Sequence, residues 1–201
     1  MLLISLNLLG KAPLPGYAKT RLIPRLGPEG AAEAQIALLT HVAGVARSWC
    51  QAKPERRFNL WCAPDCHHTL FQQVAPEGHL FPQPPGHLGE RLQVIADYGL
   101  KEARGVLLLG GDGVSMTGAV LDQAEAILKN NQALLAPSED GGYVLLGLTQ
   151  TSPDLFSHIP WGSDRVAQAT RSKFQALGWP WVEIPGQWDV DTPGDWERFS
   201  G

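Results

Sequence analysis

A basic, proline-rich loop, Leu8–Leu22 (LLGKAPLPGYAKTRL), follows an apolar run at residues 1–9. A run this short and this apolar is typical of a strand that is buried on both faces of a parallel sheet. The loop holds three cations, Lys11, Lys19 and Arg21, among two prolines and two glycines. Lysine offers a mobile point charge and arginine a planar fork of donors, and both suit phosphate oxygens. The stretch therefore predicts a stiff loop that presents positive charge to an anion, although a solvated turn with scattered basic residues would have the same composition.

The glycine spacing of this loop differs from that of a P-loop. A P-loop has four residues between its first glycine and a Gly-Lys-Ser or Gly-Lys-Thr sequence. Here five residues separate Gly10 from Gly16, and two more precede Lys19. Pro13 and Pro15 also lack the backbone N–H groups that such a loop uses to bind phosphate. Phosphate binding is therefore expected to come mainly from side chains.

Length and composition indicate an ordinary globular protein. The chain has 201 residues, of which 44% are hydrophobic and 18% charged, and this length predicts one domain over residues 1–201. The net charge of −4 argues against a nucleic-acid partner, because there is no bulk basic field. We expect no membrane span and no signal peptide, since no apolar run is long enough and the N-terminus lacks a basic region. Three cysteines, an odd number, indicate reduced thiols and a cytoplasmic location.

Strand-like and helix-like segments alternate along the rest of the chain. Apolar runs typical of strands occur at residues 57–62, 79–81, 105–109, 132–136, 143–148 and 181–184. Capping side chains, early prolines and apolar stripes indicate helix starts near Pro28, Leu88, Thr117, Ser163 and Thr192. This alternation predicts a three-layer α/β fold with a mostly parallel, mixed sheet. The two strands around residues 137–142 would also fit a hairpin.

The segment Cys62–His68 contains two cysteines and two histidines within seven residues, which is a possible zinc pattern. No second ligand pair with matching spacing follows, because His79 and His87 stand alone. The end of a strand followed by the start of a helix is therefore the favoured interpretation.

An acidic residue follows a middle strand. Asp112 lies in the turn Gly110–Gly113, directly after the expected strand at 105–109. Open α/β sheets bind ligands at the carboxyl ends of their strands, and glycines let a ligand approach the backbone. Asp112 is therefore a candidate ligand-binding residue, although an aspartate that only closes a turn would look the same. The turn is not a dinucleotide fingerprint, because no third glycine opens the next helix at the required spacing.

Two further acids, Asp189 and Asp191, precede the last expected helix. The residues after them form a complete helix start, with Thr192 as N-cap, Pro193 at the first helical position and Asp195 in a capping box. That start does not explain the acids before it. Two carboxylates separated by one residue in a loop suit a hard cation.

The basic and acidic segments have one common explanation, a nucleoside diphosphate or triphosphate bound with Mg²⁺ or Mn²⁺. The loop cations would neutralise phosphate oxygens, and Asp112 and Asp191, with Asp189, would hold the metal. The segments are far apart in the sequence, but all of them would lie at the carboxyl edge of one sheet.

Three other segments carry weaker signals. Glu90–Arg91 opens a helix and is either a surface pair or a pair at the mouth of the site. Asp140 is the only candidate general base for an attacking hydroxyl, and Gly141 and Gly142 after it would let the backbone contact a ligand. Trp161 and Trp188 lie next to motif segments, and such residues either fill the core or stack on a base or sugar.

Taken together, these motifs resemble the cofactor-C-like (DUF2064) family of glycosyltransferase-A-fold proteins, which are related to the guanylyltransferase that acts on phospholactate. The resemblance covers nearly the whole chain and rests on residues 11–22, 88–91, 111–112, 140–143, 147–148, 161–163 and 189–193. It implies the nucleotide-diphospho-sugar transferase (GT-A) fold and a metal-dependent glycosyltransferase or nucleotidyltransferase. By the same resemblance Lys19 and Arg21 contact phosphates, with Asp112 and Asp191 as metal ligands. The nucleotide-binding residues it implies are Lys11, Gly16, Lys19, Arg21, Glu90, Arg91, Gly111, Gly141 and Gly142.

The chain departs from the family pattern at one place. The family usually carries Cys-Pro or Thr-Pro after the middle-strand aspartate, whereas Asp112 is followed by Gly113–Val114. We therefore expect a more flexible loop. The departure also keeps open an alternative function, a nucleotide-binding regulatory protein without catalysis. Glycosyl transfer and nucleotidyl transfer fit the remaining residues equally well.

Overall fold

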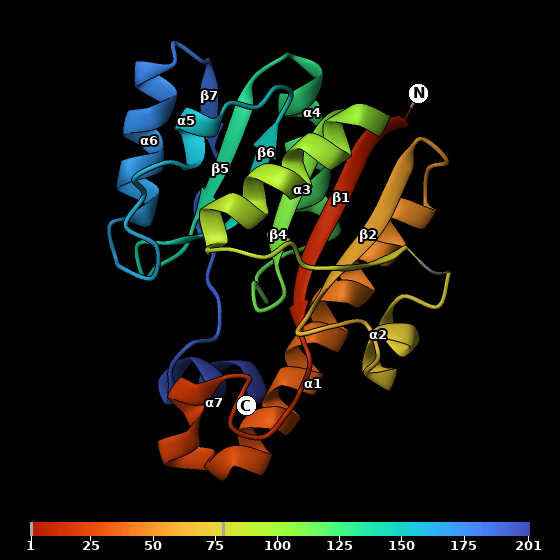
Figure 1. Cartoon of the computed structure of the whole chain (residues 1–201), viewed down its shortest axis with the longest axis vertical. Coiled ribbons are helices and arrows are strands. Elements are labelled where there is room, and N and C mark those ends of the chain that lie inside the picture. The colour runs from red at the N-terminus through yellow and green to blue at the C-terminus, as the bar shows by residue number, and fades with distance from the viewer. Residues whose placement is uncertain (1, 78) are drawn as a thin grey trace.

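The computed structural model describes residues 2–77 and 79–201 (Figure 1). Within these residues a seven-stranded sheet has the strand order β3-β2-β1-β4-β6-β5-β7. Its strands are β1 (Leu2–Lys11), β2 (Arg56–Ala63), β3 (Leu80–Pro82), β4 (Ala103–Gly110), β5 (Ala133–Pro137), β6 (Tyr143–Leu148) and β7 (Trp181–Glu183). β6 runs antiparallel to β4 and β5, and the other neighbouring pairs are parallel. The predicted mostly parallel, mixed sheet is confirmed, and β5 and β6 form the hairpin.

Helices cover both faces of this sheet, which confirms the predicted three layers. They are α1 (Ile23–Gln51), α2 (Thr69–Val74), α3 (Leu88–Glu102), α4 (Gly118–Lys129), α5 (Pro153–Phe156), α6 (Val166–Ala176) and α7 (Pro193–Ser200), with a 3₁₀ turn, η1, at Thr20–Leu22. α1, α2 and α4 pack on one face and α3, α5 and α6 on the other. Figure 1 shows α3 crossing in front of the central strands. Among the described residues, no helix is both long and apolar enough to cross a membrane.

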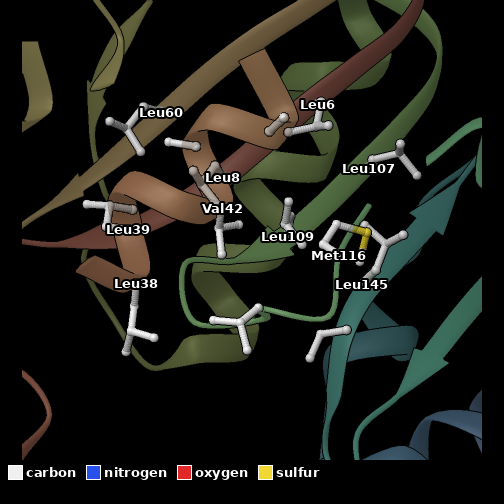
Figure 2. Packing of buried hydrophobic residues seen from close by; sticks show 14 of the residues in the cluster. Leu6, Leu8, Leu38, Leu39, Val42, Leu60, Leu107, Leu109, Met116 and Leu145 are labelled. Atoms are coloured by element: carbon white, nitrogen blue, oxygen red, sulfur yellow. The ribbon is translucent and has the colours of Figure 1, made fainter. Parts of the chain in front are cut away.

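The alternation of side chains along β1 explains why there are two cores. Leu6 and Leu8 are fully buried in the core beneath α1, close to Val42 of that helix (Figure 2). Asn7, between them, belongs to the other face, where its side-chain oxygen accepts a hydrogen bond from the Trp61 indole at 2.8 Å. Burial of one such leucine contributes about 2 kcal/mol. The two cores together fix the strand ends from which the loops of the site depart.

Two of the predicted helix caps are confirmed and one is wrong. The Thr192 and Thr117 hydroxyl oxygens accept hydrogen bonds from backbone N–H groups in the first turns of α7 and α4. Ser163 was expected to cap the next-to-last helix, but α6 begins at Val166 with Arg165 as its N-cap. The Ser163 hydroxyl donates to the carbonyl of Pro160 at 2.8 Å, and its oxygen accepts the N–H of Arg165 at 3.3 Å in the turn before α6.

Two other helix starts refine the predictions. α1 begins at Ile23 but is interrupted at Gly27, whose φ of 72° lies in the left-handed region, so its long regular part starts at Pro28 as expected. His68 caps α2, because its Nδ1 accepts the N–H of Leu70 at 3.2 Å. This use of His68 agrees with a helix start rather than a zinc ligand.

Candidate functional site

The loop after β1 holds Lys19 above the carboxyl edge of the sheet. The N–H of Ala12 donates to the Ala63 carbonyl at 2.7 Å and extends the pairing of β1 with β2. Ala18 and Leu22, on either side of Lys19, are fully buried and anchor the end of the loop. Lys19 itself has φ 49° and ψ 44°, a left-handed conformation that costs a residue with a side chain about 1–2 kcal/mol. Such a conformation persists only where the surroundings hold the residue.

The Lys19 ammonium lies between two loops that carry acidic residues. Its Nζ is 2.7 Å from a carboxylate oxygen of Asp112 and 3.1 Å from one of Asp191, and it donates to the Val190 carbonyl at 2.5 Å. Only 7% of its side chain is exposed. Burial alone would lower the pKa of Lys19, but the two carboxylates raise it, so the amine stays charged. Arg21, which is 62% exposed, also pairs with Asp191, at 2.8 Å.

Three carboxylates form one cluster beside this ammonium. Asp112, Asp189 and Asp191 each place an oxygen within 4.8 Å of the others. The N–H of Val190 donates to the Asp112 carbonyl at 3.2 Å and ties the two acidic loops together. Burial would raise the pKa of Asp112, but the charge of Lys19 lowers it. Burial and the neighbouring carboxylates raise the pKa of Asp189 to about 7.

The chemistry of this cluster fits a divalent cation. Its donors are carboxylate oxygens and one backbone carbonyl, the hard ligands that Mg²⁺ and Mn²⁺ prefer. The Lys19 ammonium already sits among these oxygens, so the local potential stabilises a cation. Asp112, Asp189 and Asp191 are the residues that could hold the metal.

A cavity of about 740 Å³ opens beside the cluster, along the carboxyl edge of the sheet. Ten of the residues predicted to bind nucleotide or metal or to act as the base line it: Lys11, Lys19, Arg21, Arg91, Gly111, Asp112, Asp140, Gly142, Asp189 and Asp191. They come from the loops after β1, β4 and β7, from the β5–β6 turn and from the start of α3. The topology therefore brings together segments that are up to 180 residues apart in the chain.

Three other candidates, Gly16, Glu90 and Gly141, are not among the residues that line this cavity. Gly16 occupies an exposed turn with φ 77°. Glu90 completes the capping box of α3, where its carboxylate accepts the N–H of His87 at 2.9 Å. Gly141 has φ 87°, and a Cβ there would lie 2.1 Å from the Asp164 carbonyl oxygen. Local geometry explains all three without a ligand.

Gln83 is a cavity residue that the sequence analysis did not identify. Its side-chain amide donates to the carbonyls of Gly10 and Trp61 at 3.3 and 3.0 Å, and its oxygen accepts from Arg91 at 3.3 Å. Arg91 also donates from Nε to the Gly86 carbonyl at 2.8 Å. Gln83 thus links the ends of β1 and β2 to the arginine. It lies in a proline-rich loop with no motif, so no local signal marks it.

Asp140 lies in the turn between β5 and β6 and also lines the cavity. One of its carboxylate oxygens accepts hydrogen bonds from the Ser138 hydroxyl and from the Gly142 N–H, the latter at 2.8 Å. The same residue therefore closes its own turn, and its role as a general base stays a prediction.

The two tryptophans near the motifs have different surroundings. Trp161 lines the cavity and meets the ring of Tyr143 edge-on, with 6.4 Å between ring centroids. Its indole nitrogen faces the protein interior, since a Cβ at Gly89 would lie 2.6 Å from it. Trp188 is not a lining residue, and it packs under the Arg198 guanidinium at 3.9 Å from the ring centroid.

The loop after Asp112, where the chain departs from the family pattern, is held by two backbone hydrogen bonds. The N–H of Val114 donates to the Asp112 carbonyl at 2.9 Å, and the N–H of Gly113 donates to the Gly110 carbonyl at 3.4 Å. Val114 is buried, and a Cβ at Gly113 would lie 2.9 Å from the Val144 Cβ. Hydrogen bonds and packing therefore hold this loop where the family pattern has a proline, and its expected flexibility stays a prediction.

Comparison with solved structures supports the nucleotide-diphospho-sugar transferase fold that the sequence predicts. A Desulfovibrio desulfuricans G20 protein, provisionally assigned as a nucleotide-diphospho-sugar transferase, is 27% identical with a TM-score of 0.82, over 96% of this chain and 84% of that one. A 4-diphosphocytidyl-2C-methyl-D-erythritol synthase from Anaerococcus prevotii is 9% identical with a TM-score of 0.62, over 98% and 96% of the two chains. A nucleotidyl transferase from Methanothermobacter is 12% identical with a TM-score of 0.61, over 98% and 95%. At these low identities the last two show the fold alone.

Comparison by sequence identifies the family. No curated protein matches the chain. The model of a family described as "Uncharacterized protein conserved in bacteria (DUF2064)" matches residues 47–163, which is more than half of the chain. This stretch includes Gln83, Arg91, Asp112, Asp140 and Trp161 from the cavity. The chain therefore belongs to the DUF2064 family, with the nucleotide-diphospho-sugar transferase fold.

Proposed function

We propose that this protein is a transferase that depends on Mg²⁺ or Mn²⁺ and acts on a nucleoside triphosphate or a nucleotide sugar. The observation that carries the proposal is the meeting of Lys19 and Arg21 with Asp112 and Asp191 at one cavity. A metal-bound diphosphate or triphosphate needs cations for its oxygens and carboxylates for its metal side by side. The fold shared with the Desulfovibrio protein supports transfer chemistry on a nucleotide.

The cations and the carboxylates of the site have different proposed roles. In this proposal Lys11, Lys19 and Arg21 bind and orient phosphate oxygens, and Asp112 and Asp191, with Asp189, would hold the metal. Lys19 would then exchange its bonds to Asp112 and Asp191 for phosphate oxygens when the metal binds. When bound, a divalent cation neutralises the negative charge that phosphate oxygens carry or develop. Catalysis then comes mostly from positioning and charge neutralisation by fixed groups.

Asp140 is the proposed base if the reaction is glycosyl transfer, because an acceptor hydroxyl must then lose a proton. Its second carboxylate oxygen has no hydrogen bond within the described part of the chain. The alternative is a non-catalytic, nucleotide-binding regulatory protein, and it rests on the Gly113–Val114 departure from the family pattern.

The proposed nucleotide-binding domain comprises the whole chain. We propose that residues 1–201 act as one nucleotide-binding domain, since the Desulfovibrio alignment covers 96% of them. The partners are a nucleotide or nucleotide sugar and an acceptor, with no nucleic acid. A cytoplasmic location is consistent with the three cysteines, all of which are free thiols.

The test is thermal unfolding against a panel of nucleoside triphosphates and nucleotide sugars, with and without Mg²⁺ or Mn²⁺. A ligand at 100 times its Kd adds about 2.7 kcal/mol to the unfolding free energy, which is roughly 5–10 °C for a domain of this size. We expect a shift that requires the metal and that Asp112→Ala abolishes. A shift of equal size without metal, or none with any nucleotide, would contradict the proposal.

A further inference from the structure

A second cavity, the amino-edge cavity, lies where β2 begins and has a volume of about 260 Å³. Its lining comes from the end of α1, the start of β2 and the segment between α2 and β3. Figure 1 shows the start of β2 beside the N-terminus, at the opposite end of the sheet from the loop after β1. None of the described residues that line it also lines the cavity of the candidate site, so the two cavities are separate.

Cations outnumber carboxylates in the lining of the amino-edge cavity. Its lysine, arginine and acidic residues are Arg47, Lys53, Arg56, Arg57 and Glu77, and His79 also lines it. The Glu77 carboxylate is already engaged, because it accepts a hydrogen bond from the Gln51 side chain at 3.0 Å. Four cations around one carboxylate favour a negatively charged ligand.

Three of these cations have carboxylate partners that lie outside the lining. The pairs are Arg56 with Asp122 and Glu125, Lys53 with Glu125 at 3.2 Å, and Arg57 with Glu102 at 3.1 Å. Arg56 is 2% exposed, whereas Lys53 and Arg57 are 48% and 36% exposed. An ammonium has three N–H donors and a guanidinium five, so Lys53 and Arg57 keep donors that a ligand can use.

Arg47 is the cation of this lining that has no counter-ion among the described residues. α1 places Arg47, Cys50 and Gln51 at spacings of three and four, so all three lie on the face of the helix that lines the cavity. None of the ion pairs around the cavity includes Arg47, and its buried Nε has no hydrogen-bond partner in the described part of the chain. A bound anion would supply the missing counter-charge.

The end of α1 opposes an anion only weakly, although a helix C-terminus carries partial negative charge. The Arg56 guanidinium donates from Nη1 to the Trp49 carbonyl at 2.9 Å. The N–H groups of Ala52 and Lys53 donate to the carbonyls of Ser48 and Cys50, both at 3.2 Å. The last carbonyls of the helix are therefore already bonded.

The start of β2 adds a backbone donor. β3 pairs only with Leu60, Trp61 and Cys62 of β2, and the N–H of Leu60 donates to the His79 carbonyl at 2.9 Å. Residues two apart on a strand direct their N–H groups toward the same edge. The N–H of Phe58, a lining residue, therefore points to this edge beyond the start of β3.

We propose that the amino-edge cavity is a second binding site, for a small anion that carries phosphate or carboxylate groups. The planar fork of arginine donors suits both groups. The cavity is smaller than the roughly 300 Å³ at which pockets for drug-sized ligands begin, so its volume fits a small anion rather than a nucleotide. The anion would contact Arg47 and the unused donors of Lys53 and Arg57. This inference does not depend on the proposed function.

The experiment is calorimetric titration of the full chain with pyrophosphate and, separately, with citrate, in buffer free of phosphate and divalent metal. At least one of the two anions should bind, and which one binds identifies the chemical source. Arg47→Met should weaken that binding about tenfold or more. Arg104→Met is the matched control, because Arg104 is an exposed arginine that lines neither cavity, and it should leave the affinity unchanged.

Arg21→Met distinguishes the two cavities, since Arg21 lines only the candidate site. Binding that survives Arg21→Met and is lost in Arg47→Met supports the inference. Binding that is lost in Arg21→Met and unchanged in Arg47→Met places the anion in the candidate site and overturns it, as does failure of both anions to bind at millimolar concentration. If Arg47→Met does not fold, Lys53→Met replaces it under the same criterion.

Discussion

Replacement of Lys19 by methionine should destabilise the metal-free protein and strengthen its response to Mn²⁺. The substitution keeps an unbranched chain of four atoms but removes the ammonium, which bonds Asp112 at 2.7 Å and Asp191 at 3.1 Å. Loss of one partner from a fully buried ion pair costs about 3–5 kcal/mol. Here the two aspartate side chains are 34% and 30% exposed, so water solvates them in part. We therefore expect a loss of about 2–3 kcal/mol, or roughly 5–10 °C in Tm.

The metal response follows from the position of the ammonium. Lys19 competes with a cation for oxygens of Asp112 and Asp191, so its removal leaves three carboxylates without that counter-ion. Mn²⁺ should raise the Tm of Lys19→Met more than that of the unaltered protein. At 100 times its Kd the metal adds about 2.7 kcal/mol, which is enough to restore the lost stability.

Differential scanning fluorimetry of both proteins across a Mn²⁺ titration measures these effects. Arg21→Met is the control: Arg21 is 62% exposed and pairs only with Asp191 among the described residues, so its loss should cost below about 1 kcal/mol. The reasoning is refuted if Lys19→Met is as stable as the unaltered protein without metal. An equal Mn²⁺ shift in the two proteins would show that the ammonium does not occupy the place of the metal.

Three further outcomes are expected. Arg21→Ala should weaken binding of a nucleoside diphosphate at least tenfold more than binding of the nucleoside, measured by calorimetry, and equal losses would mean that Arg21 only supports structure. The pKa of Asp189 is raised from 3.8 to about 7, so its ionised form opposes folding by an amount that grows from pH 4 to about 7 and is constant above. Asp189→Asn should therefore raise the Tm of the metal-free protein more at pH 8 than at pH 5, and the same gain at both would argue against a raised pKa. Thr192→Ala removes the cap of α7 and should cost about 1 kcal/mol in denaturant unfolding without changing nucleotide affinity at saturating metal.

The elements that the sequence predicts well are those whose cause is local. The apolar run of β1 and the capping box at Thr192 and Asp195 each depend on residues a few positions apart. Ser163 shows where such reasoning fails: its oxygen accepts the N–H of Arg165, as a cap would, but it does so in a turn, and the helix begins three residues later. The sequence does not distinguish a turn before a helix from the first turn of the helix.

The candidate site was predictable as a set of residues but not as an arrangement. The basic loop and the acids at Asp112 and Asp191 follow from their position after strands, a rule of the fold. That Lys19 would bond both acids, 93 and 172 residues away, depends on how three loops pack and has no signature in the chain. Gln83 was missed for the same reason, because its importance comes from the ends of β1 and β2 that it joins.

The reversed direction of β6 has a consequence for how the cavity is built. In a fully parallel sheet each strand reaches the carboxyl edge once, and the chain must then travel back through a long crossover. Because β6 is antiparallel to β5, the end of one strand and the start of the next meet at that edge. A turn of only five residues, 138–142, therefore delivers Asp140 and Tyr143 together. One wall of the cavity is thus a short hairpin anchored in two strands. In a variant with a longer hairpin turn, this wall would be mobile and Asp140 would no longer have a fixed position.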